Sequence, residues 1–566
     1  MNKQAILHVP DSKFCFAVDE KTVILRLRTS KCDKFDYIGV IYGNKYDFYK
    51  LQHEKEIKKQ YSDNYFDYYI TEIKLEDVRF VYIFKIIENG NTSYFCEEGI
   101  TDKYDFSLAY MNAFQLPYIN FADIHRVVPW MRNAVFYEIF IDRFYQGENK
   151  KNDDYINLKW GEIPNPQSFA GGDLRGIIQK LSYLKELGIN ALYLTPIFCS
   201  VSNHKYDIYD YFNVDAHFGG NGAFKELVHK AHKAGFRIVL DGVFNHCSEL
   251  LPQFQDVVKN GKQSPYFDWF IIKGEKPDKQ KLNYECFSSC SYMPKLNTSN
   301  PTLQKFLLDI AVYWIKEYDI DGWRLDVSDE VSHDFWRIFR KKVKNAKQDC
   351  VIIGENWHDA NPYLQGDQYD SIMNYAFTKA NMDFFANGSI SAQEFAQRLS
   401  RLMMCNTDQV NTMMLNLLDS HDTLRFLTQI GQNTDKLILA LAIMFMFVGV
   451  PCIYYGTEIG MVGGYDPDCR RTFDWNISNF QTPLIKIIKS LTKLKNRNEL
   501  MYGQIRFYSD NDLFVMERYS DNVMLRLTVN NSTVFKNHLK EGIILLSHNQ
   551  KDGLINSYGF VIEEVR

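Results

Sequence analysis

The stretch GWRLDVSDE at 322–330 decides the fold, because a short apolar run in it ends at a carboxylate. GENW at 354–357 and LLDSHD at 417–422 have the same form. This pattern predicts buried strands whose C-terminal ends open into a cleft. Three acids at one end of one sheet predict chemistry that both donates a proton and stabilises a developing cation, and glycoside hydrolysis fits that demand best. The three acids are Asp326, Glu355 and Asp422.

The spacing of the acids fits a β/α barrel, in which each strand–helix unit takes about 31 residues. Asp326 and Glu355 are 29 positions apart, and Glu355 and Asp422 are 67 positions apart, close to one and two units. Asp241, in the run FRIVLDGVFNH, precedes Asp326 by 85 positions. The excess of about 50 residues over one unit predicts an inserted loop subdomain at about 247–300.

Eight apolar segments supply the strands of the predicted eight-stranded β/α (TIM) barrel. Several are almost continuously hydrophobic, as strands of a parallel sheet buried on both faces are. Amphipathic segments at 174–188, 223–235 and 301–318 have apolar residues at helical spacing and separate some of these strands. The predicted strands are 134–141, 190–196, 236–243, 321–327, 351–356, 369–375, 412–419 and 450–456.

The chain has 566 residues, which is too long for a single core and suits three or four domains. Residues 1–122 contain short alternating strands and predict an N-terminal β-sandwich. The barrel is predicted over 123–498 and a C-terminal antiparallel β domain over 499–566. The many aromatic residues of the N-terminal part allow two interpretations, core and cross-strand packing or a face that stacks on carbohydrate.

Charge and hydropathy narrow the partners and the compartment. The net charge is −5, from 65 basic and 70 acidic residues without long runs of one sign, so nucleic acid and membranes are not expected partners. The most apolar stretch, 437–451, is shorter than the about 18 residues of a membrane span and is predicted as a barrel helix leading into the eighth strand. Eleven cysteines without metal-site spacing predict a reducing, cytoplasmic location.

Five motifs in this order resemble the signature regions of the alpha-amylase superfamily of retaining glycoside hydrolases. They are the three acid motifs together with DGVFNH at 241–246 and MPKLN at 293–297. MPKLN resembles the extra region of the neopullulanase, maltogenic amylase and cyclomaltodextrinase group. The resemblance covers essentially the whole chain. It implies hydrolysis of α-1,4-glucosidic bonds in cyclodextrins, maltooligosaccharides, and pullulan or starch, through a covalent glucosyl-enzyme.

The charges required by this reaction suggest a role for each acid. Asp326 follows Arg324 by two positions, so both side chains lie on one strand face. A neighbouring guanidinium favours an ionised carboxylate, which suits a nucleophile, and the resemblance implies the same role. Glu355, between VIIG and Trp357, is expected to have a raised pKa and to act as general acid and then general base. The resemblance implies that Asp422 binds sugar hydroxyls.

Further residues are candidates for binding substrate. The resemblance implies that His246 and His421 hydrogen-bond the sugar, that Tyr206 stacks on it, and that Trp357 lies on the aglycone side. A strand-end aspartate alone can instead cap a helix, and a single Arg–Asp pair is often structural, but the motifs together outweigh these alternatives. The candidate substrate-binding residues are Tyr206, Asp241, Asn245, His246, Arg324, Trp357 and His421.

A structural Ca²⁺ site is implied by the resemblance alone. QGENKKNDDY at 146–155 and GGD at 171–173 resemble a loop and a turn that hold Ca²⁺ through oxygen atoms in related enzymes. The loop carries two lysines and longer side chains than usual, so a solvated acidic loop without metal is the alternative. The candidate ligands are Glu148, Asn152, Asp153 and Asp173.

The resemblance also implies a homodimer in which the N-terminal domain covers the partner's cleft. Two other functions stay open. A glucan-transferring enzyme would pass the covalent glucosyl group to a sugar instead of water, and the motifs do not separate it from a hydrolase. An inactive sugar-binding protein is disfavoured, because such a protein is expected to lose one or more of the three acids, and all are present.

Overall fold

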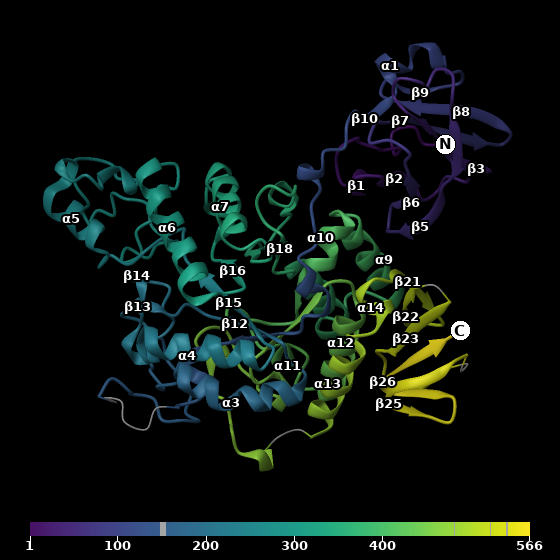
Figure 1. Cartoon of the computed structure of the whole chain (residues 1–566). Helices are drawn as coiled ribbons and strands as arrows, with labels where there is room; N and C mark the ends of the chain where they lie inside the picture. The colour runs from purple at the N-terminus through teal and green to yellow at the C-terminus, as the bar shows by residue number, and fades with distance from the viewer. Residues whose placement is uncertain (148–153, 480–481, 521, 539–540) are drawn as a thin grey trace.

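A parallel barrel forms the centre of the computed structural model, which describes all residues except 148–153, 480–481, 521 and 539–540 (Figure 1). Its strand order is β18-β17-β16-β15-β12-β11-β20-β19. A parallel bridge between Met373 and Leu415 joins the two ends of this order and closes the barrel. Each of the eight predicted segments contains one strand, so the predicted TIM barrel is confirmed. The strands are β11 (Phe136–Ile139), β12 (Ala191–Leu194), β15 (Arg237–Gly242), β16 (Gly322–Leu325), β17 (Val351–Gly354), β18 (Ser371–Ile372), β19 (Leu415–Leu417) and β20 (Val450–Tyr454).

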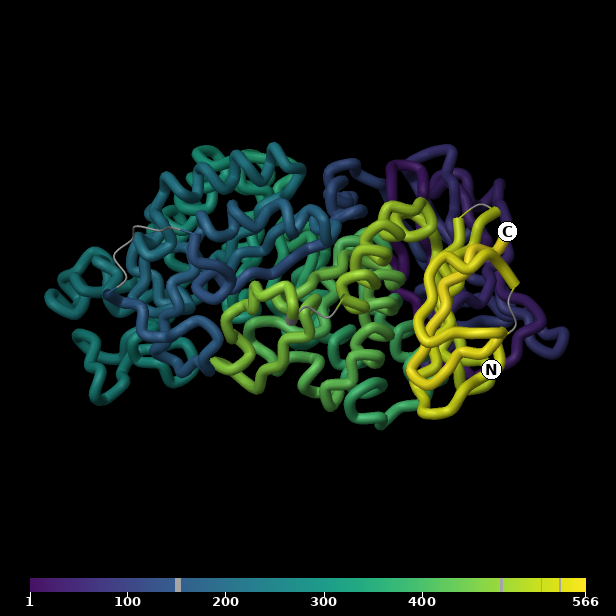
Figure 2. The backbone as a smooth tube through the Cα atoms, turned by 90° about the horizontal axis from the view of Figure 1, so that it is seen from below, coloured from purple at the N-terminus to yellow at the C-terminus, as the bar shows by residue number. Residues whose placement is uncertain are grey.

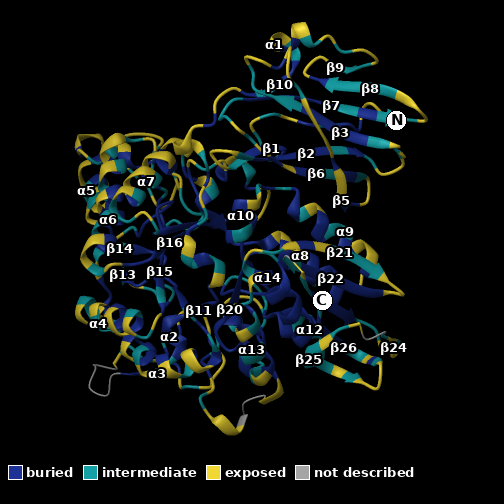
Figure 3. Cartoon of the chain, turned by 45° about the vertical axis from the view of Figure 1, so that its right-hand side comes forward, coloured by how far each residue is buried: buried dark blue, intermediate teal, exposed yellow. Residues whose placement is uncertain are grey.

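Helices surround the barrel and turn their polar faces outward, as the exposed surfaces in Figure 3 show. The three amphipathic segments are confirmed as α3, α4 and α6. α3 begins where Asp173 accepts the Gly176 N–H and ends at Gly188, whose φ of 90° suits glycine. The main helices are α3 (Leu174–Leu187), α4 (Gly220–Lys233), α6 (Pro301–Tyr318), α7 (His333–Ala346), α8 (Tyr375–Asn381), α9 (Ala392–Met403), α10 (Asp408–Met413), α12 (Thr434–Met446) and α13 (Thr482–Leu494).

The apolar stretch at 437–451 lies in α12 and the start of β20, as predicted. Its helix is buried along almost its whole length, which accounts for the lack of polar residues. Among the described residues, no helix combines the length and the hydropathy needed to cross a membrane.

Two antiparallel sheets form the N-terminal part. Their orders are β1-β2-β6-β5 and β4-β3-β7-β8-β9, with β10 paired to β7. Phe80, Tyr82 and Phe84 are fully buried between the sheets, so core packing is confirmed for these aromatic residues. The strands are β1 (Cys15–Asp19), β2 (Thr22–Ser30), β3 (Tyr37–Gly43), β4 (His53–Glu56), β5 (Lys58–Ser62), β6 (Phe66–Lys74), β7 (Phe80–Glu88), β8 (Asn91–Cys96), β9 (Gly99–Thr101) and β10 (Phe114–Leu116).

One antiparallel sheet forms the C-terminal part, in the order β21-β22-β23-β26-β24, with β25 also paired to β26. It lies beside the N-terminal sheets at one end of the molecule (Figure 2), where the Tyr61 hydroxyl donates to the Ile505 carbonyl at 3.0 Å. The exact domain boundaries stay a prediction. The strands are β21 (Gln504–Asp510), β22 (Leu513–Ser520), β23 (Val523–Asn530), β24 (Lys536–Asn537), β25 (Ile543–Lys551) and β26 (Leu554–Val565).

A long excursion follows β15, as the spacing of the acids predicted. It contains α5 (Pro252–Asn260) and a set of isolated bridges, and it projects at the opposite end of the molecule from the C-terminal sheet (Figures 1 and 2). The bridge between His246 and Lys295 brings the MPKLN segment back to the end of β15. This segment therefore lies at the carboxyl end of the barrel, beside the predicted site.

Candidate active site

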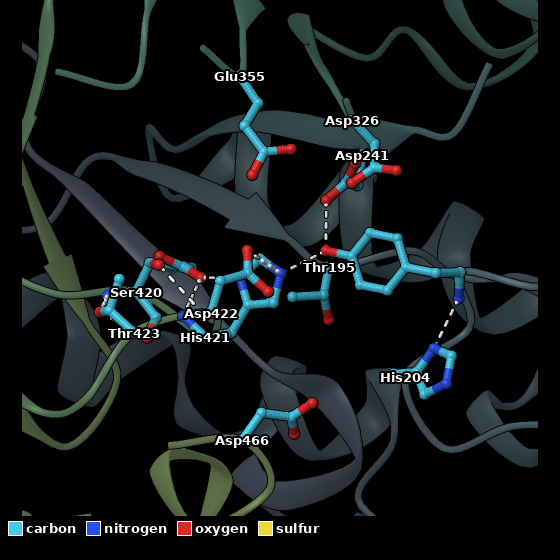
Figure 4. Close-up of polar contacts among 12 residues, drawn as sticks. Thr195, His204, Asp241, Asp326, Glu355, Ser420, His421, Asp422, Thr423 and Asp466 are labelled. Atoms are coloured by element: carbon cyan, nitrogen blue, oxygen red, sulfur yellow. Dashed lines mark hydrogen bonds and ion pairs between the residues drawn. The ribbon is translucent and has the colours of Figure 1, made fainter. Parts of the chain in front are cut away.

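The site is centred on Arg324, a fully buried residue of β16. Its Nη1 lies 3.0 Å from Asp326 Oδ1 and 3.0 Å from both carboxylate oxygens of Asp241. Its Nη2 lies 2.9 Å from Glu355 Oε2 and 4.0 Å from Asp422 Oδ2. Figure 4 shows these four acids facing a common space. The three predicted acids are therefore brought together, with Asp241 as a fourth carboxylate around one cation.

The backbone ladder of the barrel positions the acids. The N–H of Asp326 donates to the Gly242 carbonyl at 3.1 Å, and that of Glu355 donates to Leu325 at 3.0 Å. Each acid is thus the last residue held by the sheet before the chain leaves it. Val327 has a φ of 43°, an unusual value for a β-branched residue, and its N–H donates to Glu355 Oε2 at 2.9 Å. This turn couples the loop after Asp326 to the carboxylate of Glu355.

Burial controls the protonation of the two central acids. The pKa of Glu355 is raised because burial outweighs the Arg324 charge, as we predicted. The pKa of Asp326 is also raised by burial, and Arg324 does not overcome this. Arg324 does favour the ionised form of Asp326, as we predicted, but burial and the neighbouring carboxylates raise the pKa by more. Burial thus favours the protonated form of both carboxyl groups, which suits a site in which one of them donates a proton.

Asp422 is the most open and the most acidic of the three. Its side chain is 29% exposed, against 8% for Asp326. Burial raises its pKa, but the charges of His421, Arg470 and Arg324 lower it by a larger amount, so the net pKa is below the usual range. The ionised form is therefore favoured more strongly for Asp422 than for Asp326 or Glu355.

His421 and Tyr206 connect this acid to the barrel wall. The Tyr206 hydroxyl lies 2.9 Å from Asp241 Oδ2 and 2.5 Å from His421 Nε2, and the two rings are parallel. His421 Nδ1 lies 2.5 Å from Glu138 Oε1. Glu138 was not among the predicted residues, although a single acid within the apolar run AVFYEIFI was a usable signal.

His246 and Asn245 form the opposite wall. His246 stacks on Phe287 with ring centroids 4.8 Å apart, and its Nε2 lies 4.0 Å from Asp326 Oδ2. Burial and Lys295 lower the pKa of His246 to about 3, so this imidazole is neutral. Lys295 of MPKLN donates to the Asn245 side-chain oxygen. Among the described residues, His246 Nε2 and Asp326 Oδ2 are buried without a hydrogen-bond partner, so both atoms have unused hydrogen-bonding capacity.

Trp357 lies at the edge of the site. Its indole stacks on the Tyr375 ring with centroids 3.7 Å apart, and its Nε1 donates to Glu355 Oε1 at 3.2 Å. Trp357 is 51% exposed, so much of its surface is free to contact a ligand. The pair lines a cavity of about 480 Å³ together with Asn374 and Arg401. An aromatic surface next to an acid suits a sugar ring.

Arg470 was missed by the sequence reasoning. Its Nη2 donates to Asp422 Oδ1 at 3.2 Å, its Nε donates to the His421 carbonyl at 2.8 Å, and its Nη1 lies 2.9 Å from Asp466 Oδ1. It comes from the loop after β20, 48 positions beyond Asp422. No local pattern indicated this contact.

Asp173 is the one predicted Ca²⁺ ligand that lies among the described residues. Glu148, Asn152 and Asp153 lie outside the described residues. Asp173 accepts the N–H groups of Gly147 and Gly176 at 3.2 and 2.8 Å. Within the described ranges, no group of three or more His, Cys, Asp or Glu side chains is arranged to hold a metal ion. The calcium site stays a prediction.

Comparisons with known proteins agree with this geometry. Residues 138–502 match the family model "Alpha amylase, catalytic domain", and residues 1–120 match "Alpha amylase, N-terminal ig-like domain". The chain is 43% identical to a cyclomaltodextrinase of Thermoanaerobacter pseudethanolicus over 98% of both chains. It is 42% identical to an intracellular maltogenic amylase of Bacillus subtilis over 88% of this chain and 85% of that protein. A solved cyclomaltodextrinase structure aligns with a TM-score of 0.90 at 34% identity, covering 100% of this chain and 98% of the other.

Proposed function

This chain belongs to the alpha-amylase family of glycoside hydrolases, and from that premise we propose that it hydrolyses α-1,4-glucosidic bonds in cyclodextrins and maltooligosaccharides. The observation that carries the proposal is the guanidinium of Arg324, which contacts both Asp326 and Glu355. A retaining mechanism requires one ionised carboxylate, which attacks the sugar, and one protonated carboxyl group, which donates to the leaving oxygen. The name of the cyclomaltodextrinase relative supports the substrate class.

In the first step we assign the nucleophile to Asp326 and the acid to Glu355. Asp326 Oδ2, which has no hydrogen-bond partner among the described residues, attacks the anomeric carbon. The bond to the glycosidic oxygen breaks, and Glu355 gives its proton to that oxygen. In the second step Glu355 removes a proton from water, the water oxygen attacks the anomeric carbon, and Asp326 leaves as a carboxylate.

The surrounding residues are assigned to binding. Asp422 accepts hydrogen bonds from hydroxyls of the reacting sugar, and His421 donates to them. Neutral His246 contacts the sugar from the opposite wall. The stacked Trp357 and Tyr375 hold the sugar on the leaving-group side. Arg324 keeps the carboxylates in place, and its charge limits their mutual repulsion.

Product analysis tests this function. Wild type, Asp326→Asn and the matched surface variant Asp309→Asn are incubated with β-cyclodextrin, soluble starch and pullulan. We expect wild type and Asp309→Asn to open the cyclodextrin to maltose and glucose, and Asp326→Asn to leave it intact. Cleavage of starch with cyclodextrin untouched would contradict the proposed substrate. The ratio of transfer products to reducing ends separates the hydrolase from the glucan-transferring alternative, and failure with all three glucans supports the binding-protein alternative.

A homodimer is proposed on the resemblance, with the N-terminal domain of one copy over the cleft of the other. Sedimentation velocity at assay concentrations measures the assembly. A strict monomer that still hydrolyses cyclodextrin would contradict this arrangement.

A structural Ca²⁺ ion near Asp173 and a cytoplasmic location are also proposals. The oxygen-rich segments around 146–155 and 171–173 support the ion, and a thermal-shift assay with chelator and with added Ca²⁺ tests it. Identical melting temperatures in both conditions would rule the ion out. The name of the intracellular maltogenic amylase relative supports the location, which fractionation of cells that make the protein tests.

A further inference from the structure

Glu138 is a buried carboxylate for which the proposed reaction has no direct use. It lies in the middle of β11, is 0% exposed, and is in register with Tyr193 of β12 and Tyr454 of β20. Its Oε1 lies 3.2 Å from the His421 backbone nitrogen and 2.5 Å from His421 Nδ1, while Oε2 has no hydrogen-bond partner among the described residues. His421 thus contacts this carboxylate through both its backbone N–H and its ring. A buried carboxylate is costly unless such a partner compensates its charge.

The hydrogen bonds around His421 determine which of its nitrogens carry hydrogen. Asp241 accepts hydrogen bonds from Arg324 and from the Tyr193 hydroxyl. A carboxylate can only accept, so the single hydroxyl hydrogen of Tyr206 points to Asp241, at 2.9 Å. The Tyr206 oxygen therefore acts as acceptor toward His421 Nε2 at 2.5 Å. His421 Nε2 thus carries a hydrogen.

The second acceptor near Nε2 leads to the same result, and the other nitrogen faces an acceptor as well. Asp422 Oδ2 lies 3.2 Å from Nε2 and belongs to a carboxylate that also accepts from Arg470 Nη2 at 3.2 Å, so it faces Nε2 as an acceptor. Glu138 Oε1 already accepts the His421 backbone N–H, so it faces Nδ1 as an acceptor. Both ring nitrogens therefore carry hydrogen, and an imidazole with two N–H groups is a cation.

We propose that Glu138 is a positioning residue that holds His421 as an imidazolium between its own carboxylate and that of Asp422, next to the reacting sugar. This inference rests on the proposed function, because it gives the charge of His421 a role in substrate binding. The imidazolium keeps Asp422 ionised and presents a charged N–H donor to the sugar. Charged donors make stronger hydrogen bonds than neutral ones.

Other charged groups around the pair act in both directions. Asp422 and Glu138 raise the pKa of His421, while burial and Arg470 lower it, and the net pKa is raised. His204, which is stacked near Tyr206, has a pKa lowered to about 3 and stays neutral. Asp419 lies near Glu138, and burial raises its pKa to about 6, against the charge of Arg425. Glu138 is therefore the buried carboxylate that directly contacts Nδ1.

The test compares pH profiles of kcat/KM for β-cyclodextrin in wild type, Glu138→Gln and Glu458→Gln. Glutamine keeps an acceptor for His421 but removes the negative charge, so His421 loses its second proton at a lower pH. We expect the alkaline limb of Glu138→Gln to move down by at least about one pH unit, with an about tenfold loss for each pH unit above it. On the acid side of the plateau its activity stays within about threefold of wild type.

Glu458→Gln is the matched control. Glu458 is also fully buried, but its Oε1 accepts only from the Tyr137 and Tyr183 hydroxyls, at 2.6 and 2.9 Å, among the described residues. We expect its pH profile to keep the wild-type shape. Superimposable profiles for Glu138→Gln and wild type would overturn the proposal. An equal loss at every pH would also overturn it, because a merely structural support gives that result.

A second readout does not depend on activity. Nitrogen-15 NMR of labelled histidine, with the His421 signal assigned by its absence in His421→Asn, reports the protonation of both ring nitrogens. The proposal predicts an imidazolium in wild type at pH 7 and a neutral ring in Glu138→Gln. A neutral wild-type ring would overturn it even if Glu138→Gln does not fold. An imidazolium in a protein that cleaves no glucan would contradict the proposed function and leave the Glu138 assignment standing.

Discussion

The two ends of the barrel treat buried carboxylates in opposite ways. At the amino end, Asp370 precedes β18 and is fully buried. It accepts from Arg340 Nη1 at 2.8 Å, from Lys344 Nζ at 2.7 Å and from the Ile352 N–H at 2.9 Å. Burial raises its pKa, but the two cations lower it by a larger amount, so the net pKa lies well below the usual range.

Asp321, which precedes β16, repeats this arrangement. His232, Arg237 and Lys347 all contact its carboxylate, at distances of 2.7 to 2.9 Å. Burial raises its pKa, yet hydrogen bonds from His232 and Ile238 together with Lys347 bring it down to about 2. At the amino end, each buried acid has more than one positively charged or hydrogen-bonding partner.

At the carboxyl end, Asp326, Glu355 and Asp241 share the single guanidinium of Arg324. The pKa values of Asp326 and Glu355 are raised by burial, in spite of that cation. This difference indicates that the acids at the amino end of the barrel contribute to stability, whereas Asp326 and Glu355 at the carboxyl end serve the reaction. At the amino end each of these two acids contacts two or more cations, whereas at the carboxyl end Asp326 and Glu355 share one cation and can take up or release protons.

Asp326→Asn is expected to have the largest effect. The loss of the nucleophile lowers kcat for β-cyclodextrin by about 10⁴-fold or more. The melting temperature stays the same or rises, because the amide removes a carboxylate whose pKa is raised by burial. Steady-state kinetics and calorimetry at pH 7 measure the two effects. A clear drop in melting temperature would show that the carboxyl end also uses its acids for stability.

Asp370→Asn is expected to do the reverse. It leaves the half-buried Arg340 and Lys344 beside a neutral group, which costs about 3 kcal/mol of stability. Denaturant unfolding measures this cost, and kcat at 25 °C stays within about twofold of wild type because the chemistry is at the other end. Asp334→Asn is the control, since its pair with Arg337 is exposed and contributes little. Equal stability of the two variants would contradict the comparison.

Acid titration of stability tests the amino end in the wild-type protein. The folded pKa of Asp321 is about 2, below its unfolded value near 4, so its contribution is complete above pH 4. That contribution, about 2 kcal/mol, is lost as the pH falls from about 4 toward 2. Unfolding curves over this range should be flatter for Asp321→Asn than for wild type. Parallel curves would mean that the cations around Asp321 do not stabilise its ionised form.

The pH dependence of catalysis tests the carboxyl end, with the smallest expected effect. Activity requires ionised Asp326, which sets the acid limb, and protonated Glu355 and His421, which set the alkaline limb, so kcat/KM follows a bell-shaped curve. Both pKa values are raised, so both limbs should lie above the range of ordinary carboxylic acids. Rates measured between about pH 4 and 9 define the limbs. Limbs at ordinary carboxylate values would remove the contrast with the amino end.

The sequence predicted the barrel because strand-forming runs and helical periodicity are local properties. All eight segments contain a strand, and Asp326, Glu355 and Asp422 meet around Arg324. The Arg324–Asp326 contact was also visible, since the two residues are two positions apart on one strand.

Contacts between distant segments could not be predicted in the same way. Glu138 and His421 are 283 positions apart, and Arg470 reaches Asp422 from a loop with no regular period. The raised pKa of Asp326 was missed for a related reason. It depends on how many carboxylates share Arg324 and on how much water burial removes, and both are properties of the closed barrel rather than of the motif.

The most informative single experiment is to trap the covalent intermediate, because it shows directly whether Asp326 is the nucleophile. Glu355→Gln is incubated with α-maltosyl fluoride, whose leaving group needs no acid, so that the second step lacks its base and the glycosyl-enzyme accumulates. Peptide mass spectrometry locates the added sugar, with Asp326→Asn as the control. If Asp326 is the nucleophile, we expect one maltosyl group on Asp326 and none in the control. A sugar on another residue, or turnover to the β-anomer without any adduct, would contradict it.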